Sequence, residues 1–428
     1  MVKAKIIDAR TYPNAVFGSQ KTIQGLEKDL ARNNLSDIAS IDGPFSLATE
    51  RNDEIVILRN SPGIPLYVIS DRTTLYVANT IKRLHDVTGS FRYNDVRIVP
   101  SAHTIRFNGK ELSFQRYRDE LPTTQVDMSL DEIGYQLREE LTTAVKRMAE
   151  HDRGKNVAVL LSGGIDSAAV ATILRENREG VVGYTLDVGG KDLVNAQIVA
   201  ERLKIPLKKV PIDRDELISS LSKYIEIAEE YRPFVIDNVP GFYFLGRAAA
   251  HDGIEVLFTG SAANEMFGDY YPSSDYDVPV EQNAKQAQRK LLIEGRKPAD
   301  PLYNKVLGSG LDRYGFIKSL MEFGIESREP WGASNVLQFG IQIPERILLR
   351  ENRHRKPDIA RIAFPEIGTY PEKERMADGS GISQSFTTDY RTNREIFEKL
   401  FNVNERRHNQ YLLAMERTFT CGGKTKKK

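Results

Sequence analysis

The first part of the chain alternates short apolar runs with turn residues. Between residues 41 and 118, three such runs are bounded by Gly, Pro, Asn or Asp: Glu54-Ile-Val-Ile-Leu58, Leu66-Tyr-Val-Ile69 and Thr74-Leu-Tyr-Val77. Short runs between turn residues are typical of strands that pair in antiparallel sheets. The pattern therefore predicts a small, mainly antiparallel β region at the beginning of the chain.

The pattern changes near residue 120. Ser129-Leu-Asp-Glu132 has the form of a capping box, in which Ser and Glu each satisfy a free backbone donor at a helix start. Apolar residues then repeat at helical spacing, at Ile133, Leu137, Leu141, Val145 and Met148. We expect an amphipathic helix that opens a second domain, which divides the chain into residues 1–122 and 123–428.

From residue 156 onward, strands and helices are predicted to alternate. Residues 156–161 and 255–258 are nearly continuous apolar runs, as expected for parallel strands covered on both faces. A further strand is predicted at 181–186, with helices around 168–175 and 193–203. This order predicts a doubly wound parallel α/β sheet, followed by a helix-rich C-terminal part.

Composition and charge limit the classes of function. The chain has 428 residues, 40% of them apolar and 28% charged, which is typical of a soluble protein of two to three domains. A net charge of +1 argues against nucleic-acid binding through the whole surface, although a local basic groove stays open. Because no apolar run approaches the roughly 18 residues of a membrane span, we expect a cytoplasmic protein.

The chain contains a single cysteine, Cys421. One cysteine excludes both an intrachain disulfide framework and a zinc site built mainly from cysteines.

The segment Leu161-Ser-Gly-Gly-Ile-Asp-Ser167 lies between a predicted strand and a predicted helix. Its two glycines permit a tight turn that points backbone N–H groups at an anion, and its two serines add hydroxyl donors. Asp166 would repel a phosphate unless Mg²⁺ lay between them. The segment therefore predicts a site for a metal-bound nucleotide; the alternative is a turn that only caps the helix. No Walker Gly-Lys-Ser/Thr ending occurs, so γ-phosphate transfer is not indicated.

The motif Ser-Gly-Gly-x-Asp-Ser resembles the loop of enzymes that cleave ATP between its α and β phosphates. Two more segments narrow the resemblance to the asparagine synthetase family. Thr259-Gly-Ser-Ala-Ala-Asn-Glu-Met-Phe-Gly-Asp-Tyr270 is similar to the family's Ser-Gly-Glu-Gly-Ser-Asp-Glu-x-Phe-Gly-Gly-Tyr. Lys373-Glu-Arg-Met-Ala-Asp-Gly-Ser-Gly-Ile-Ser383 is similar to its Lys-Glu-x-x-x-Asp-Gly-x-Gly-x-Ser loop. The resemblance covers most of residues 126–390.

Between these segments, Gly324-Ile-Glu-Ser-Arg-Glu-Pro330 resembles the family's Gly-x-Glu-x-Arg-x-Pro. We expect Glu326 and Arg328 to form a buried ion pair in the domain core, rather than to contact a substrate.

The resemblance implies an ATP- and Mg²⁺-dependent amide ligase. A substrate carboxylate attacks the α-phosphorus, pyrophosphate leaves, and ammonia or a substrate amine then displaces AMP. The expected partners are thus a small-molecule carboxylate and an amine. The implied nucleotide-binding residues are Leu161, Ser162, Gly163, Gly164, Asp166, Ser167, Leu186 and Gly260.

The resemblance also implies residues for the metal and the chemistry. Lys373 is the candidate that neutralises the leaving pyrophosphate. The metal ligands are Asp166 and Asn264, where the amide stands in place of the family's Asp and brings no charge. Glu265 is retained, whereas Ser261 replaces the family's Glu at a position associated with acylation and the attacking amine. This departure permits a different amine, a relocated base or a reduced activity.

Residues before 122 resemble the later half of the family's glutaminase domain, at Asp42-Gly-Pro-Phe-Ser-Leu-Ala48 and Leu58-Arg-Asn-Ser-Pro-Gly-Ile-Pro-Leu-Tyr67. An active glutaminase needs a cysteine nucleophile at its processed N-terminus, but position 2 is Val2 and the only cysteine is Cys421. We therefore expect a truncated remnant of the Ntn-hydrolase type that does not hydrolyse glutamine. It is expected to pack against the synthetase domain or to mediate self-association as a homodimer.

Three alternatives stay open. The first is an intramolecular cyclising amide synthetase, like β-lactam synthetase in logic, that uses an amine within the substrate. The second is a nucleotide-binding scaffold whose catalysis has decayed, which the residues Ser261, Asn264 and Val2 favour. The third transfers sulfur to RNA, but it usually needs catalytic cysteines that this chain lacks. The sequence leaves open which carboxylate and amine are used and what residues 271–310 do.

Overall fold

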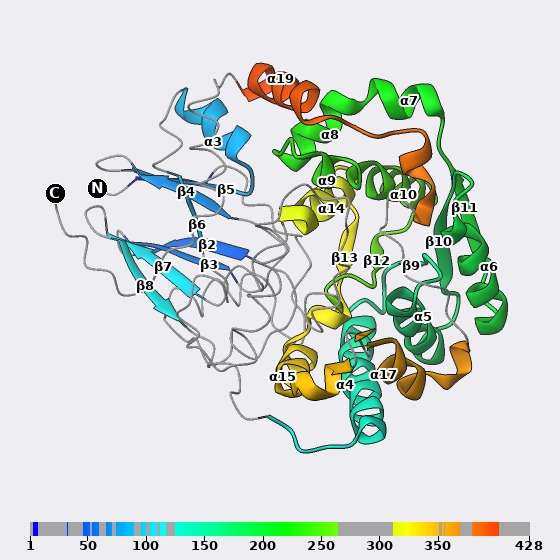
Figure 1. Ribbon diagram of the computed structural model, residues 1–428. Helices are drawn as coiled ribbons and strands as arrows, with labels where there is room; N and C mark the ends of the chain where they lie inside the picture. The colour runs from blue at the N-terminus through cyan, green and yellow to red at the C-terminus, as the bar shows by residue number, and fades with distance from the viewer. Residues whose placement is uncertain are drawn as a thin grey trace. The chain divides into compact units, whose positions relative to one another are not determined.

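The computed structural model describes residues 3–6, 32, 46–51, 54–59, 66–70, 74–89, 96–99, 103–108, 112–116, 125–263, 311–350, 353–354, 356–368 and 379–401. The chain divides into two compact units. The first includes Met1–Glu120, and the second includes Leu121–Gly295 and Gly315–Arg394. Figure 1 shows their helices and strands. The assignment of residues 1–122 to a glutaminase-like domain and of 123–428 to a synthetase domain stays a prediction.

Two four-stranded sheets make up the first unit, with the orders β1-β5-β4-β6 and β2-β3-β7-β8. Neighbouring strands are antiparallel except for β1 and β5, which are parallel. The two sheets share one apolar core, to which β3, β4, β5 and β7 all contribute buried residues. The alternating runs therefore predicted this region correctly. The elements are β1 (Lys3–Ile6), β2 (Ser46–Arg51), β3 (Glu54–Arg59), β4 (Tyr67–Ser70), β5 (Thr74–Ala78), α3 (Ile81–Thr88), β6 (Arg97–Ile98), β7 (His103–Phe107) and β8 (Leu112–Arg116).

The helix predicted after residue 129 is confirmed as α4 (Leu130–His151). Its capping box is present: the Ser129 hydroxyl accepts a hydrogen bond from the Glu132 N–H at 3.3 Å, and the Glu132 carboxylate accepts one from the Ser129 N–H at 2.8 Å. The bond from the Ser129 N–H, followed by a second bond from the Ser129 hydroxyl to the same carboxylate at 2.8 Å, lowers the pKa of Glu132. The five apolar residues at helical spacing, from Ile133 to Met148, are all buried.

Replacing Ser129 by alanine is expected to lower the free energy of unfolding by about 1 kcal/mol, because the helix loses the side chain that caps its N-terminus. Ser222, an exposed residue within a helix, is the matched control. Ser222→Ala removes a hydroxyl that caps nothing, so it is expected to change stability by less than about 0.5 kcal/mol. Denaturant unfolding of both variants measures the difference, and equal losses would contradict the role of the cap.

The second unit is built on a parallel sheet with the strand order β11-β10-β9-β12-β13. Its strands are β9 (Val157–Leu160), β10 (Val182–Asp187), β11 (Leu207–Pro211), β12 (Val256–Phe258) and β13 (Glu326–Arg328). α5 (Ile165–Asn177) joins β9 to β10, α6 (Lys191–Leu203) joins β10 to β11, and α10 (Val239–His251) leads back to β12. Because such crossovers are right-handed, α10 covers the face opposite to α5 and α6. The predicted doubly wound α/β sheet is confirmed.

Further helices surround this sheet, and the C-terminal part is rich in helices, as predicted. α4 packs against α5, α15 and α17 (Figure 1). Among the described residues, no helix combines the length and apolarity that crossing a membrane requires. The remaining elements are α7 (Arg214–Ser219), α8 (Leu221–Ala228), α9 (Pro233–Ile236), α14 (Leu311–Met321), η2 (Pro330–Gly332), α15 (Ser334–Gln342), α16 (Glu345–Leu348), β14 (Leu349–Arg350), β15 (Arg353–His354), α17 (Lys356–Ala363), η3 (Pro365–Ile367), η4 (Ile382–Gln384) and α19 (Tyr390–Phe401).

Candidate functional site

The order of the strands changes direction between β9 and β12. From β9 the chain moves outward to β10 and β11, and it then returns to the other side of β9 to form β12. In open α/β sheets, ligands bind at the carboxyl ends of strands where the direction reverses in this way. The loop that begins at Leu161 follows β9, and the loop that begins at Thr259 follows β12. Both loops therefore begin at the edge of the sheet where a ligand is expected to bind.

The loop after β9 has the backbone of an anion-binding turn. Gly163 has a φ of +74°, which glycine adopts without strain. Gly164 is the N-cap residue of α5 and makes no side-chain capping bond. No side chain at the N-cap therefore occupies the N–H groups of the first turn of α5, and these groups favour an anionic ligand.

The two serines shape this loop from within. Ser167 is buried, and its hydroxyl donates to the Gly164 carbonyl at 3.0 Å and accepts from the Ser162 N–H at 3.2 Å. The Ser162 hydroxyl accepts from the Gly164 N–H at 3.3 Å. We expected both hydroxyls to donate to a phosphate. In this structure the Ser167 hydroxyl closes the loop instead, whereas Ser162 is exposed.

Close backbone contacts hold the loop in place. A Cβ atom on Gly163 would overlap the backbone of α6 at Asn195 and Ala196. A Cβ atom on Gly260 would lie 2.6 Å from the Ser167 nitrogen and 2.8 Å from the Asp166 carbonyl carbon. The loop after β12 therefore touches the first turn of α5 directly, and only glycine fits at either contact.

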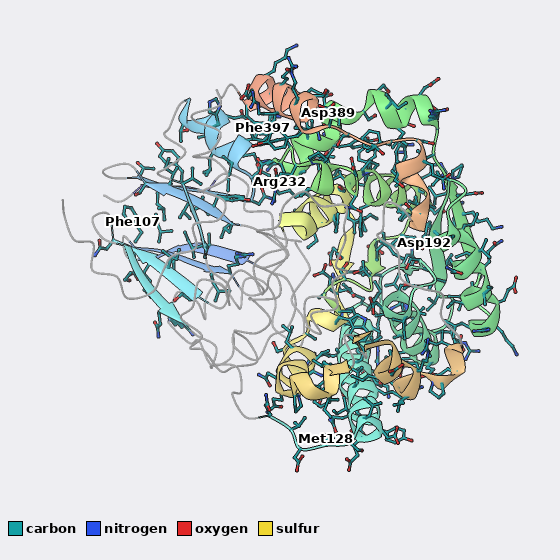
Figure 2. All side chains as sticks on the ribbon, viewed as in Figure 1. Phe107, Met128, Asp192, Arg232, Asp389 and Phe397 are labelled. Atoms are coloured by element: carbon teal, nitrogen blue, oxygen red, sulfur yellow. The ribbon has the colours of Figure 1, made fainter. Side chains whose placement is uncertain are left out.

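A third segment reaches the same edge of the sheet. A Cβ atom on Gly381, whose φ is +90°, would lie 2.7 Å from the Gly190 nitrogen, just beyond the end of β10. One on Gly379 would lie 2.6 Å from a carboxylate oxygen of Asp192, at the start of α6 (Figure 2). The Gly-x-Gly part of the segment 373–383 thus lies against the β10–α6 loop. Lys373 itself lies outside the described residues.

Part of the chain is similar in sequence to known proteins. Residues 136–317 match the model of the asparagine synthase family. These residues therefore form a domain of the asparagine synthase family. The chain is 24% identical to a probable glutamine-hydrolyzing asparagine synthetase of Schizosaccharomyces pombe over 390 residues, which is 80% of this chain and 64% of that protein. It is 24% identical to the glutamine-hydrolyzing asparagine synthetase B of Escherichia coli over 360 residues, which is 79% of this chain and 61% of that protein.

The chain thus spans less than two thirds of the length of these asparagine synthetases. Among solved structures, the NH3-dependent NAD synthetase of Campylobacter jejuni matches 42% of this chain and 82% of its own, at 17% identity and a TM-score of 0.25. The NMN synthetase of Francisella tularensis matches 67% and 97%, at 13% identity and the same TM-score. Scores this low add nothing to the fold, which rests on the strand order.

Asp166 fits the metal-ligand role that the asparagine synthase family implies. It is the second residue of α5, next to the anion-binding turn, and its carboxylate is the oxygen ligand that Mg²⁺ prefers. Within the described ranges, no three His, Cys, Asp or Glu side chains cluster as a complete metal site. A metal held by Asp166 would take its further ligands from the nucleotide, from water or from residues outside these ranges, such as the predicted Asn264. Asn264 and Glu265 lie outside the described residues.

The loop after β12 has a positive φ at the position where the family motif has its second glycine. Ala262 stands at a glycine of the family motif and has a φ of +79°. The Ser261 N–H donates to the Thr259 hydroxyl at 3.3 Å, so Ser261 belongs to this turn. Leu186, the other predicted nucleotide contact, is buried in β10.

Glu326 and Arg328 form the buried ion pair that was predicted. The Arg328 guanidinium donates to Glu326 at 2.6 Å and to both oxygens of Asp152 at 2.8 Å. Lys155 adds a bond to Glu326 at 3.0 Å. Asp152 and Lys155 precede β9, so this network lies at the opposite end of the strand from the anion-binding turn. Its role is structural.

One contact at the site could not be predicted from the sequence. Trp331 follows β13, is fully buried, and donates its indole N–H to the Asp166 carbonyl at 3.0 Å. The only sequence signal was that it is the sole tryptophan of the chain.

Proposed function

We propose that this protein is an ATP- and Mg²⁺-dependent amide ligase that adenylates a carboxylate. The observation that carries the proposal is the contact between Gly260 and the Asp166–Ser167 peptide. It joins the two glycine-rich loops after β9 and β12 at the switch point of the sheet, where a nucleotide is expected to bind. The match of residues 136–317 to the model of the asparagine synthase family supports the type of reaction.

The described residues supply groups that would bind the phosphates of ATP. The N–H groups at the start of α5 attract negative charge, and Gly163 and Gly164 let the backbone approach it closely. Asp166 would hold Mg²⁺ beside them, and the bound ion supplies neutralisation of the phosphate charge.

The proposed reaction has two steps. In the first, a carboxylate oxygen attacks the α-phosphorus, the bond to the bridging oxygen breaks, and pyrophosphate leaves. In the second, an amine nitrogen attacks the acyl carbon, AMP leaves with the bonding electrons, and the nitrogen loses a proton. Lys373 is proposed to neutralise the leaving pyrophosphate.

The nitrogen is proposed to come from ammonia or a substrate amine rather than from glutamine. Cys421, the only cysteine of the chain, is the only thiol that the chain offers for glutamine hydrolysis. We therefore expect glutamine to be a far poorer nitrogen source than ammonium chloride, and Cys421→Ser to leave the activity unchanged. Loss of activity in Cys421→Ser would contradict this part of the proposal.

Replacing Asp166 by asparagine is expected to lower the rate of AMP formation by more than ten-fold, because the metal loses its charged ligand at the transition state. Chelation of Mg²⁺ by EDTA is expected to stop the wild type as well. The matched control is Asp215→Asn, which makes the same change on an exposed residue of α7. If both variants lose activity equally, or neither does, Asp166 has no special role.

The second candidate is a nucleotide-binding scaffold without turnover. Ser261, where the asparagine synthase family has Glu, favours it because the loop then lacks a carboxylate that the family uses. ATP binding without any AMP across a panel of carboxylates and amines would support the scaffold, and AMP formation would exclude it. An amide formed only within one substrate molecule would identify the cyclising variant of the ligase.

A further inference from the structure

The peptide between Asp166 and Ser167 is held from two sides. The Trp331 indole N–H donates to its oxygen at 3.0 Å. The bare Cα of Gly260 lies against the same peptide, since an added Cβ would come within 2.8 Å of the Asp166 carbonyl carbon. Both groups follow strands on the far side of β9, namely β12 and β13. Residues that follow β12 and β13 therefore hold the first turn of α5 in position.

The hydrogen bond from Trp331 reaches the first turn of α5. Asp166 is the second residue of the helix, and its carbonyl also has a partner four residues further on within the helix. The indole is thus a second donor to one carbonyl. Trp331 is fully buried and cannot turn toward water, so its N–H has a fixed direction. Because Asp166 has few freely rotating bonds, fixing its peptide also restricts where its carboxylate can point.

We propose that Trp331 is a positioning residue, which aims the Asp166 carboxylate at the metal of a bound Mg·ATP through its hydrogen bond to the Asp166 carbonyl. The inference rests on the proposed function, because it assumes that Asp166 is the metal ligand. Groups that orient a metal ligand without touching the metal typically change metal affinity by about 10-fold to 100-fold.

Two changes at Trp331 test this. Trp331→Phe keeps an aromatic ring and removes the N–H. Since the chain has a single tryptophan, it can also be replaced throughout by benzothienylalanine, which has the shape of tryptophan with sulfur in place of the N–H. This second change keeps the packing if phenylalanine does not. Tyr184→Phe is the control, because it removes another single hydrogen bond of a buried aromatic residue, to Asp252 at 2.8 Å.

The measured quantity is the dissociation constant of ATP, determined by calorimetry with Mg²⁺ and with EDTA. We expect the Trp331 changes to weaken Mg·ATP binding about ten-fold and to change ATP binding in EDTA by less than two-fold. Tyr184→Phe is expected to leave both dissociation constants within two-fold of the wild type, while lowering the melting temperature by a few degrees.

A merely structural role for Trp331 would shift both constants equally or shift neither, and either result overturns the inference while leaving the proposed function intact. If the wild type itself does not bind Mg·ATP, the proposed function and this inference fail together.

Discussion

Gly163→Ala is expected to lower the free energy of unfolding by about 2–5 kcal/mol and to abolish nucleotide binding. At a φ of +74°, any other residue is strained by about 1–2 kcal/mol. The added Cβ also overlaps the backbone of α6 at Asn195 and Ala196, so the loop or the helix must move, at a further cost of about 1–3 kcal/mol. Such a movement displaces the amides that are proposed to bind phosphate.

Gly180→Ala is the matched control for this variant. Gly180 has nearly the same φ, +71°, but a Cβ there meets nothing within 4 Å. Gly180→Ala should therefore show only the backbone strain of about 1–2 kcal/mol and keep nucleotide binding. The fluorescence of Trp331, the only tryptophan, reports the unfolding of this unit, and calorimetry reports ATP binding. Equal losses in the two variants would show that the contact with α6 is unimportant.

Arg328→Ala is expected to lower the free energy of unfolding by about 3–5 kcal/mol. The Arg328 and Asp152 side chains are fully buried, and Glu326 is nearly so. Removing the guanidinium leaves two carboxylates in the interior without their main partner, and an uncompensated buried charge is costly. Denaturant unfolding followed by Trp331 fluorescence measures the loss.

Arg153→Ala serves as its control. Arg153 is 80% exposed and lies 3.8 Å from Glu150, an exposed pair that contributes little. We expect its stability to stay within about 0.5 kcal/mol of the wild type. If Arg328→Ala were equally mild, the network would not be a core element, and a direct role of Arg328 at a ligand would need to be reconsidered.

Local rules predicted much of the second unit. The capping box at Ser129 and Glu132 determines where α4 begins, and two adjacent glycines between strand and helix predict the anion-binding turn. In each case the cause lies within a few neighbouring residues, so it is visible in the sequence. The ion pair of Arg328 was also predictable, because two opposite charges stand two residues apart in a family motif.

The remaining features depend on contacts between distant segments. β13 consists of Glu326, Ser327 and Arg328, which are all buried, so no apolar run in the sequence predicts this strand. β11 is equally hard to predict from the sequence, because it lies at the edge of the sheet and exposes Lys208 and Lys209. The hydrogen bond from the Ser167 hydroxyl to the Gly164 carbonyl depends on how the loop folds back on itself. The hydrogen bond from Trp331 to the Asp166 carbonyl joins residues that are 165 positions apart. Lys373, Asn264 and Glu265 stay predictions.

The transfer of labelled oxygen shows whether a carboxylate attacks the α-phosphorus of ATP. The purified protein is incubated with Mg·ATP, ammonium chloride and a panel of amino and carboxylic acids whose carboxylates carry ¹⁸O, and the nucleotide products are analysed by mass spectrometry. Attack of a carboxylate on the α-phosphorus predicts pyrophosphate and AMP that carries one ¹⁸O atom. Formation of ADP and phosphate, or of AMP without label, or no consumption of ATP with any member of the panel, would contradict the account.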